Sequence, residues 1–122
     1  MRGQENMKRV LTFCITALLM VLLVSCGAKN DVRTLNDFEN AYITMGYTLD
    51  NKDTPFYQMI GAQDGVMFDI GNSTVKIYEY KTIDDLKQNQ QKYPITNNMS
   101  SNGKFLLDTI SQDAINVFKG VK

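Results

Sequence analysis

The chain has 122 residues, with 13 basic and 13 acidic side chains and no histidine. Without histidine it lacks the commonest general base and the commonest metal ligand, and without a surplus of positive charge it lacks the electrostatic footprint of a nucleic-acid-binding protein. Composition and charge therefore argue against an enzyme, a metal site and a nucleic-acid partner.

Near the N-terminus, a pair of basic residues is followed by an apolar run. Lys8 and Arg9 precede residues 10–24, in which only Thr12 and Thr16 are polar. As a helix these 15 residues would reach roughly 22 Å, short of the roughly 30 Å hydrocarbon core of a membrane. The pattern is typical of a secretory signal peptide. Counted through Ala28, the run reaches about 28 Å, so an uncleaved N-terminal anchor stays open as an alternative.

The apolar run ends in Leu23-Val24-Ser25-Cys26, with an apolar residue three positions before the cysteine and a small residue directly before it. This tetrad resembles the lipobox of a bacterial lipoprotein signal peptide. The resemblance implies that the thiol of Cys26 carries a diacylglyceryl group and that the chain is cleaved between Ser25 and Cys26. The product would then be anchored to the cell membrane by lipid, facing the extracytoplasmic side. An ordinary buried thiol at Cys26 is the alternative.

These features divide the chain into three parts. We expect a signal peptide over 1–25, with translation beginning at Met7, a lipidated N-terminus and tether over 26–33, and a single domain over 34–122. The 97 residues after the cleavage site carry 10 basic and 12 acidic side chains, for a net charge of −2. Because Cys14 leaves with the signal peptide, the domain has no disulfide and depends on an apolar core. We expect a monomer without metal or cofactor.

The first predicted element of the domain is a helix that Thr34 caps and Gly46 ends. Four apolar side chains recur at helical spacing along it and predict a face toward the core: Leu35, Phe38, Tyr42 and Met45. The following Asp50-Asn51-Lys52-Asp53 is rich in oxygen ligands, but it lacks the spacing, the turn glycine and the final glutamate of an EF-hand. A solvated turn before Pro55 is therefore preferred to a calcium loop.

Three strands are predicted next, over 56–62, 66–70 and 74–81. Residues 63–65 and 71–73 supply glycine-containing turns between them, which predicts an antiparallel meander. In the second strand Val66, Phe68 and Ile70 share one face, opposite Met67 and Asp69. In the third strand Val75 and Ile77 share one face, opposite Lys76, Tyr78 and Tyr80.

Segments of this meander carry a second resemblance. Tyr57–Ala62, Asp64-Gly65 and Val75–Tyr80 are similar to segments of small lipoproteins from clostridia and related Gram-positive bacteria whose function is uncharacterised. The similarity covers about a quarter of the chain. It implies an extracytoplasmic lipoprotein and transfers no catalytic residue.

The C-terminal part adds two helices and a strand. A helix is predicted from Thr82 to Tyr93, where Pro94 ends it, followed by an exposed loop over 95–103 and a strand over 105–109. Ser111 then caps a last helix that ends at Gly120. The order α-β-β-β-α-β-α predicts the α+β class, as a small two-layer sandwich with a mainly antiparallel four-stranded sheet and helices on one face.

The candidate binding surface is the aromatic pair Tyr78 and Tyr80, on the strand face opposite Val75 and Ile77. An exposed pair would form an aromatic recognition patch, whereas cross-strand packing beneath a helix is the structural alternative. Two carboxylate pairs are candidate catalytic groups. Asp64 with Asp69 flanks a predicted hairpin and Asp84 with Asp85 caps a predicted helix, so structural roles account for both pairs.

The function expected from these observations is that of a non-catalytic binding or accessory protein of the cell envelope, with another envelope protein as partner. A small inhibitor of an extracytoplasmic enzyme, or of a phage or host factor, is the alternative. A solute-binding protein is disfavoured because 97 residues cannot form two lobes around a cleft.

Overall fold

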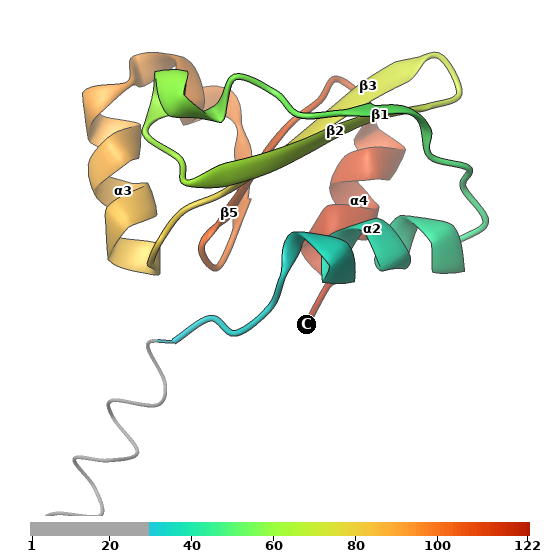
Figure 1. The fold of residues 1–122 in the computed structure, drawn as a ribbon, viewed down its shortest axis with the longest axis horizontal. Helices are drawn as coiled ribbons and strands as arrows, with labels where there is room; N and C mark the ends of the chain where they lie inside the picture. Colours follow the sequence, from blue (N-terminus) through green and yellow to red (C-terminus); the bar gives the residue numbers. More distant parts are fainter. Residues whose placement is uncertain (1–29) are drawn as a thin grey trace, which may run out of the picture. The chain divides into compact units, whose positions relative to one another are not determined.

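A five-stranded antiparallel sheet is the central element of the structure, a computed structural model that describes residues 30–122 (Figure 1). The strands lie in the order β1-β2-β3-β5-β4. The expected signal peptide, Ser25 and Cys26 lie outside the described residues. The strands are β1 (Asp50–Asp53), β2 (Asp64–Ile70), β3 (Ser73–Glu79), β4 (Ser100–Asn102) and β5 (Phe105–Asp108).

The β2–β3 hairpin sets the register of the sheet. Phe68 pairs with Val75 and Val66 with Ile77, and all four side chains are buried. The alternation of apolar side chains therefore predicted the correct buried face of both strands. The turn between them contains Gly71 with a φ of +60°, a conformation that glycine adopts without steric cost.

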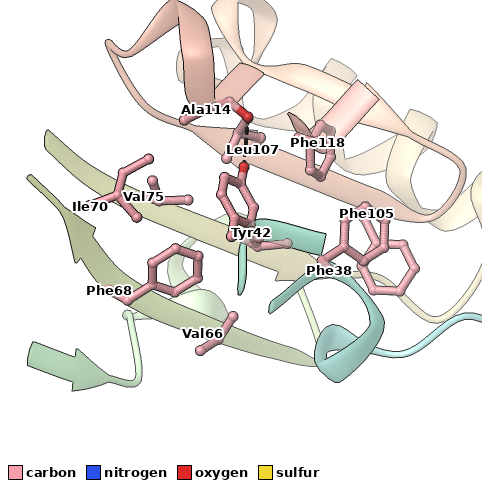
Figure 2. Packing of buried hydrophobic residues seen from close by; sticks show 11 residues of the cluster. Phe38, Tyr42, Val66, Phe68, Ile70, Val75, Phe105, Leu107, Ala114 and Phe118 are labelled. Atoms are coloured by element: carbon pink, nitrogen blue, oxygen red, sulfur yellow. Dashed lines mark hydrogen bonds between the residues drawn. The ribbon is translucent and has the colours of Figure 1, made fainter. Parts of the chain in front are cut away.

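Two helices, α2 (Leu35–Thr44) and α4 (Gln112–Gly120), cover this face of the sheet. The buried side chains between the helices and the sheet form the first core: Phe38, Tyr42, Val66, Phe68, Ile70, Val75, Ile77, Phe105, Leu107, Ala114 and Phe118. Phe38 of α2 stacks against Phe105 of β5 with ring centroids 4.3 Å apart. The Tyr42 hydroxyl donates a 2.7 Å hydrogen bond to the carbonyl of Ala114, which joins the two helices within the first core (Figure 2). Both helices begin at the predicted caps: the side chains of Thr34 and Ser111 accept hydrogen bonds from backbone N–H groups of the first turn.

The opposite face of the sheet carries a second, smaller core. Tyr78 and Leu106 alternate along their strands with residues of the first core and pack with Leu86 of helix α3 (Ile83–Lys92). The α+β class and the antiparallel sheet are thus confirmed, with five strands instead of four. The expectation that helices cover only one face is wrong, because α3 covers part of the second face.

Two strands were missed and one predicted strand is absent. Residues 57–60 form a short 3₁₀ helix, η1 (Tyr57–Ile60), which ends at Gly61 with a φ of +74°. The predicted turn at 63–65 is also wrong, since Asp64 and Gly65 pair with Glu79 and Tyr78 within the hairpin. The apolar residues of 56–62 suggested a strand, but no neighbouring strand pairs with them, and only pairing makes an extended segment a strand.

The missed strands are the two edges of the sheet. Residues 50–53, predicted as a turn, form β1, and all four side chains are exposed. The predicted loop 95–103 contains β4 and a second 3₁₀ helix, η2 (Pro94–Asn98). Edge strands are held by backbone hydrogen bonds to one neighbour, so they need no alternating apolar pattern and leave little trace in the sequence.

Candidate functional site

The two tyrosines expected to form a binding surface belong to the second core. Tyr80 is completely buried and Tyr78 is 7% exposed. The Tyr80 hydroxyl donates a 2.8 Å hydrogen bond to the carbonyl of Ile60. Burial raises the pKa of Tyr80 to about 12 and also raises the pKa of Tyr78. The prediction of an exposed aromatic patch is therefore wrong, and the structural alternative holds: both tyrosines pack beneath α3 and η1.

An open groove of about 660 Å³ lies directly beside this core, on the same face of the sheet. The small exposed part of the Tyr78 side chain forms part of the groove floor, together with Met67 and Lys76. Residues just before and within η1, and residues of η2 and its C-cap, also line the groove. The lining residues are Asp53, Thr54, Pro55, Phe56, Met59, Ile60, Met67, Lys76, Tyr78, Ile95, Met99 and Asp108.

Three large apolar side chains of the groove project into solvent. Phe56 is 81% exposed, Met59 72% and Ile95 73%. Single exposed apolar residues are common on proteins, but three that line one groove form a patch, and contiguous apolar patches mark interaction sites. We call Phe56, Met59 and Ile95 the apolar rim.

Backbone geometry places the apolar rim. The chain contains two prolines, and each directly precedes a rim residue: Pro55 before Phe56, and Pro94 before Ile95. Pro55 is buried and lies against Gly65 of β2, where an added Cβ would come within 2.9 Å of the proline ring. The missing side chain at Gly65 and the fixed φ of Pro55 thus direct Phe56 outward.

Charged side chains complete the floor of the groove in one row across the sheet. The strand register aligns Asp53 of β1 with Met67 of β2, Met67 with Lys76 of β3, and Lys76 with Asp108 of β5. The row therefore carries two carboxylates and one ammonium group. A partner that covers the groove meets apolar side chains around a charged row with a net charge of −1.

The groove offers apolar contacts and three charged groups, Asp53, Lys76 and Asp108. The chain has no histidine, and among residues 30–122 no cluster of three or more acidic, histidine or cysteine side chains could hold a metal ion. In the same residues, no helix is both long and apolar enough to cross a membrane. The groove is thus suited to recognition by shape, apolar contact and charge.

The two carboxylate pairs considered from the sequence have structural roles. Asp64 and Asp69 lie near opposite ends of β2, and hydrogen bonds from Asn51 and Thr74 lower the pKa of Asp69. Asp84 and Asp85 are in the first turn of α3, where negative charge stabilises the helix dipole. None of these four carboxylates lines the groove.

A second hollow, of about 600 Å³, lies between α2 and α4. Its lining includes Ala41, Met45, Tyr47, Val117 and Val121. Of these residues only Met45 is strongly exposed, at 67%, so this hollow lacks a projecting apolar patch. The groove with the apolar rim is the stronger candidate for a binding site.

Sequence reasoning missed the groove because its residues are scattered over β1, η1, β2, β3, η2 and β5. The one local signal was a large apolar residue directly after each proline. No family model matches the chain, and neither a curated protein nor a solved structure shows significant similarity to it.

Proposed function

We propose that this chain is an extracytoplasmic lipoprotein, anchored to the membrane through Cys26, whose domain is a non-catalytic binding or accessory protein of the cell envelope. The observation that carries the binding role is the groove lined by the exposed side chains of Phe56, Met59 and Ile95. The anchor rests on the lipobox Leu23-Val24-Ser25-Cys26 and the basic pair before the apolar run.

The open form of the groove favours a protein partner over a small molecule. A ligand pocket typically buries most of the ligand surface, which requires walls that close around it. Here the rim side chains are at least 72% exposed, so the groove does not enclose its occupant. Protein–protein interfaces are enriched in aromatic residues and methionine, and the groove exposes Phe56 and Met59.

Site-specific photo-crosslinking in the native host tests the proposal. A p-benzoylphenylalanine residue is introduced in place of Phe56 in one strain and in place of Ile95 in another. The matched control position is Ile110, which is 95% exposed but does not line the groove. We expect one envelope protein to be crosslinked from both groove positions and not from position 110.

A further variant tests whether recognition depends on the groove surface. Met59→Ser should abolish the crosslink from position 56 without unfolding the domain, because the Met59 side chain is already 72% exposed. Equal crosslinking from all three positions, or none from the groove, would contradict the proposal. A captured enzyme that loses its activity on binding would identify the protein as an inhibitor.

A further inference from the structure

A clamp of polar contacts holds the segment before α2 against the domain. Arg33 contacts both carboxylate oxygens of Asp31, at 2.9 and 2.7 Å, and also donates hydrogen bonds to the carbonyls of Asn102 and Val121. Asp31 in turn accepts a hydrogen bond from the backbone N–H of Lys104. Residues 31–33, expected as part of the tether, are therefore fixed to the β4–β5 turn and to the C-terminal end of α4.

The clamp also lies on the first core. The Arg33 guanidinium is 5.3 Å from the ring centroid of Phe38 and 5.7 Å from that of Phe105. Its side chain is only 17% exposed and that of Asp31 only 6%. Val32, between them, is by contrast 86% exposed. The two flanking side chains thus hold the segment while Val32 projects away from the domain.

The groove lies on the other side of the molecule. Its floor residues Met67, Lys76 and Asp108 alternate along the strands with residues of the first core, the core to which Phe38 and Phe105 beneath the Arg33 guanidinium belong. Figure 1 shows the same separation: segment 31–33, in cyan, and the C-terminus are at the bottom of the domain, whereas η1, in green, and η2, in orange, are at the top.

The length of chain between the clamp and Cys26 limits how the domain can be oriented. Five residue steps separate Cys26 from Asp31, and a fully extended chain spans at most about 18 Å over that distance. A domain of this size has a radius of gyration of about 12 Å and a width of about 30 Å. With the clamp closed, the tether is too short to let the groove side rest on the membrane. Opening the clamp would add three residues and extend the reach to about 28 Å.

We propose that the clamp side of the domain, marked by Val32, faces the lipid surface and that the Asp31–Arg33 clamp holds the groove directed away from the membrane. This inference rests on the proposed lipidation of Cys26. The clamp thereby limits the tether to the residues between Cys26 and Asp31. The groove is then presented to partners in the extracytoplasmic space.

Fluorescence quenching on vesicles tests this orientation with the full-length, processed protein. Because the mature chain has no thiol other than the lipidated Cys26, a fluorophore can be attached to Val32→Cys in one sample and to Ile95→Cys in another. The proteins are reconstituted in vesicles of phosphatidylglycerol and phosphatidylethanolamine that contain a headgroup nitroxide quencher. We expect at least threefold stronger quenching at position 32 than at position 95.

Two variants separate the clamp from the anchor. Inserting 12 Gly and Ser residues between Gly27 and Ala28 should bring the two quenching values close together, and Arg33→Gln should do so in part. Equal or stronger quenching at position 95 in the unmodified tether would overturn the orientation. Mass spectrometry of the same samples reports the diacylglyceryl group on Cys26, so an unlipidated product would instead refute the proposed anchor and the orientation with it.

Discussion

Tyr80, directly after β3, donates a 2.8 Å hydrogen bond from its hydroxyl to the backbone carbonyl of Ile60 in η1. The bond joins the sheet to the segment that carries two residues of the apolar rim. Both partners are buried, so neither can exchange this bond for one to water. The position of the groove wall therefore depends on a side chain that the groove itself does not expose.

We expect Tyr80→Phe to lower the free energy of unfolding by about 1–3 kcal/mol, because the buried Ile60 carbonyl loses its donor. Urea denaturation measures the change. Tyr78→Phe is the matched control and should cost less, since the Tyr78 side chain retains some contact with solvent at 7% exposure. Partner capture by Tyr80→Phe should fall only in proportion to the folded fraction. Complete loss of capture by a fully folded variant would assign Tyr80 to the binding site.

Substitution of Gly103 tests how much the clamp contributes to stability. This glycine has a φ of +61°, and an added Cβ would collide with the side chains of Asp31 and Arg33. Gly71 has nearly the same φ, +60°, but open space around it. We expect Gly71→Ala to cost about 1–2 kcal/mol for the left-handed backbone alone. Gly103→Ala should cost about 1 kcal/mol more, because the ion pair must also open.

Thermal unfolding of both variants, alone and combined with the double replacement Asp31→Ala and Arg33→Ala, checks this prediction. If the clamp is the source of the difference, Gly103→Ala and Gly71→Ala should become equally destabilising once both clamp side chains are truncated. An unchanged difference in that background would show that Gly103 matters for another reason.

The clamp should also contribute to stability in a pH-dependent way. The hydrogen bond from the Arg33 side chain holds the pKa of Asp31 at about 2, below its usual 3.8. Because the folded-state pKa is lowered, the stabilisation is fully present above about pH 5 and is lost as the pH falls toward 2. We expect Asp31→Asn to lose about 1 kcal/mol at pH 6, since solvent screens part of the interaction.

The measurement is the free energy of urea unfolding of wild type and Asp31→Asn at pH 6, 4 and 2.5. The difference between the two proteins should shrink steadily as the pH is lowered. A difference that stays constant over this range would mean that ionisation of Asp31 does not contribute to folding.

Lipidation is tested by Cys26→Ala. Removing the thiol eliminates the acceptor of the diacylglyceryl group, so the protein should remain an uncleaved precursor or be released in soluble form. Metabolic labelling with a fatty-acid probe should mark the wild type and not the variant. Equal labelling of the two proteins would exclude Cys26 as the lipidated residue.

The domain itself should fold without its anchor. Residues 31–122 form one compact unit with two apolar cores and contain no cysteine. We expect a fragment from Lys29 to Lys122 to be a monomer in sedimentation experiments and to melt cooperatively. A chelator should leave its melting temperature unchanged, and a chelator-dependent melting temperature would reveal a metal requirement.

Elements with a local signal could be predicted well from the sequence. Thr34, Thr82 and Ser111 cap the three α-helices of residues 30–122 where the sequence predicts each helix to begin, because a capping hydroxyl bonds to N–H groups within the next three residues. The alternation in β2 and β3 identified their buried faces for a similar reason: side chains two residues apart point the same way whatever the rest of the chain does.

Features that depend on distant neighbours were not predictable in this way. Tyr78 and Tyr80 were placed on the correct side of β3, but whether that side is covered depends on α3 and η1, which no pattern in β3 reports. The groove likewise exists only because the fold brings together residues that are distant in the sequence. Phe56 and Ile95, which both line it, are 39 positions apart.

By itself, then, the sequence determined the α+β class, the central hairpin with its buried face and the three α-helices of residues 30–122, whereas the lipidation of Cys26 stays a prediction. These features depend on hydrogen bonds, periodicity and motifs that act over a few residues. Only the tertiary structure decided that the tyrosines are core, that β1 and β4 form the sheet edges, and that the Asp31–Arg33 clamp and the groove lie on opposite sides of the sheet. Each of these features arises from contacts between segments far apart in the chain. Whether a side chain is buried depends on which segments pack against it, and its own identity does not decide this.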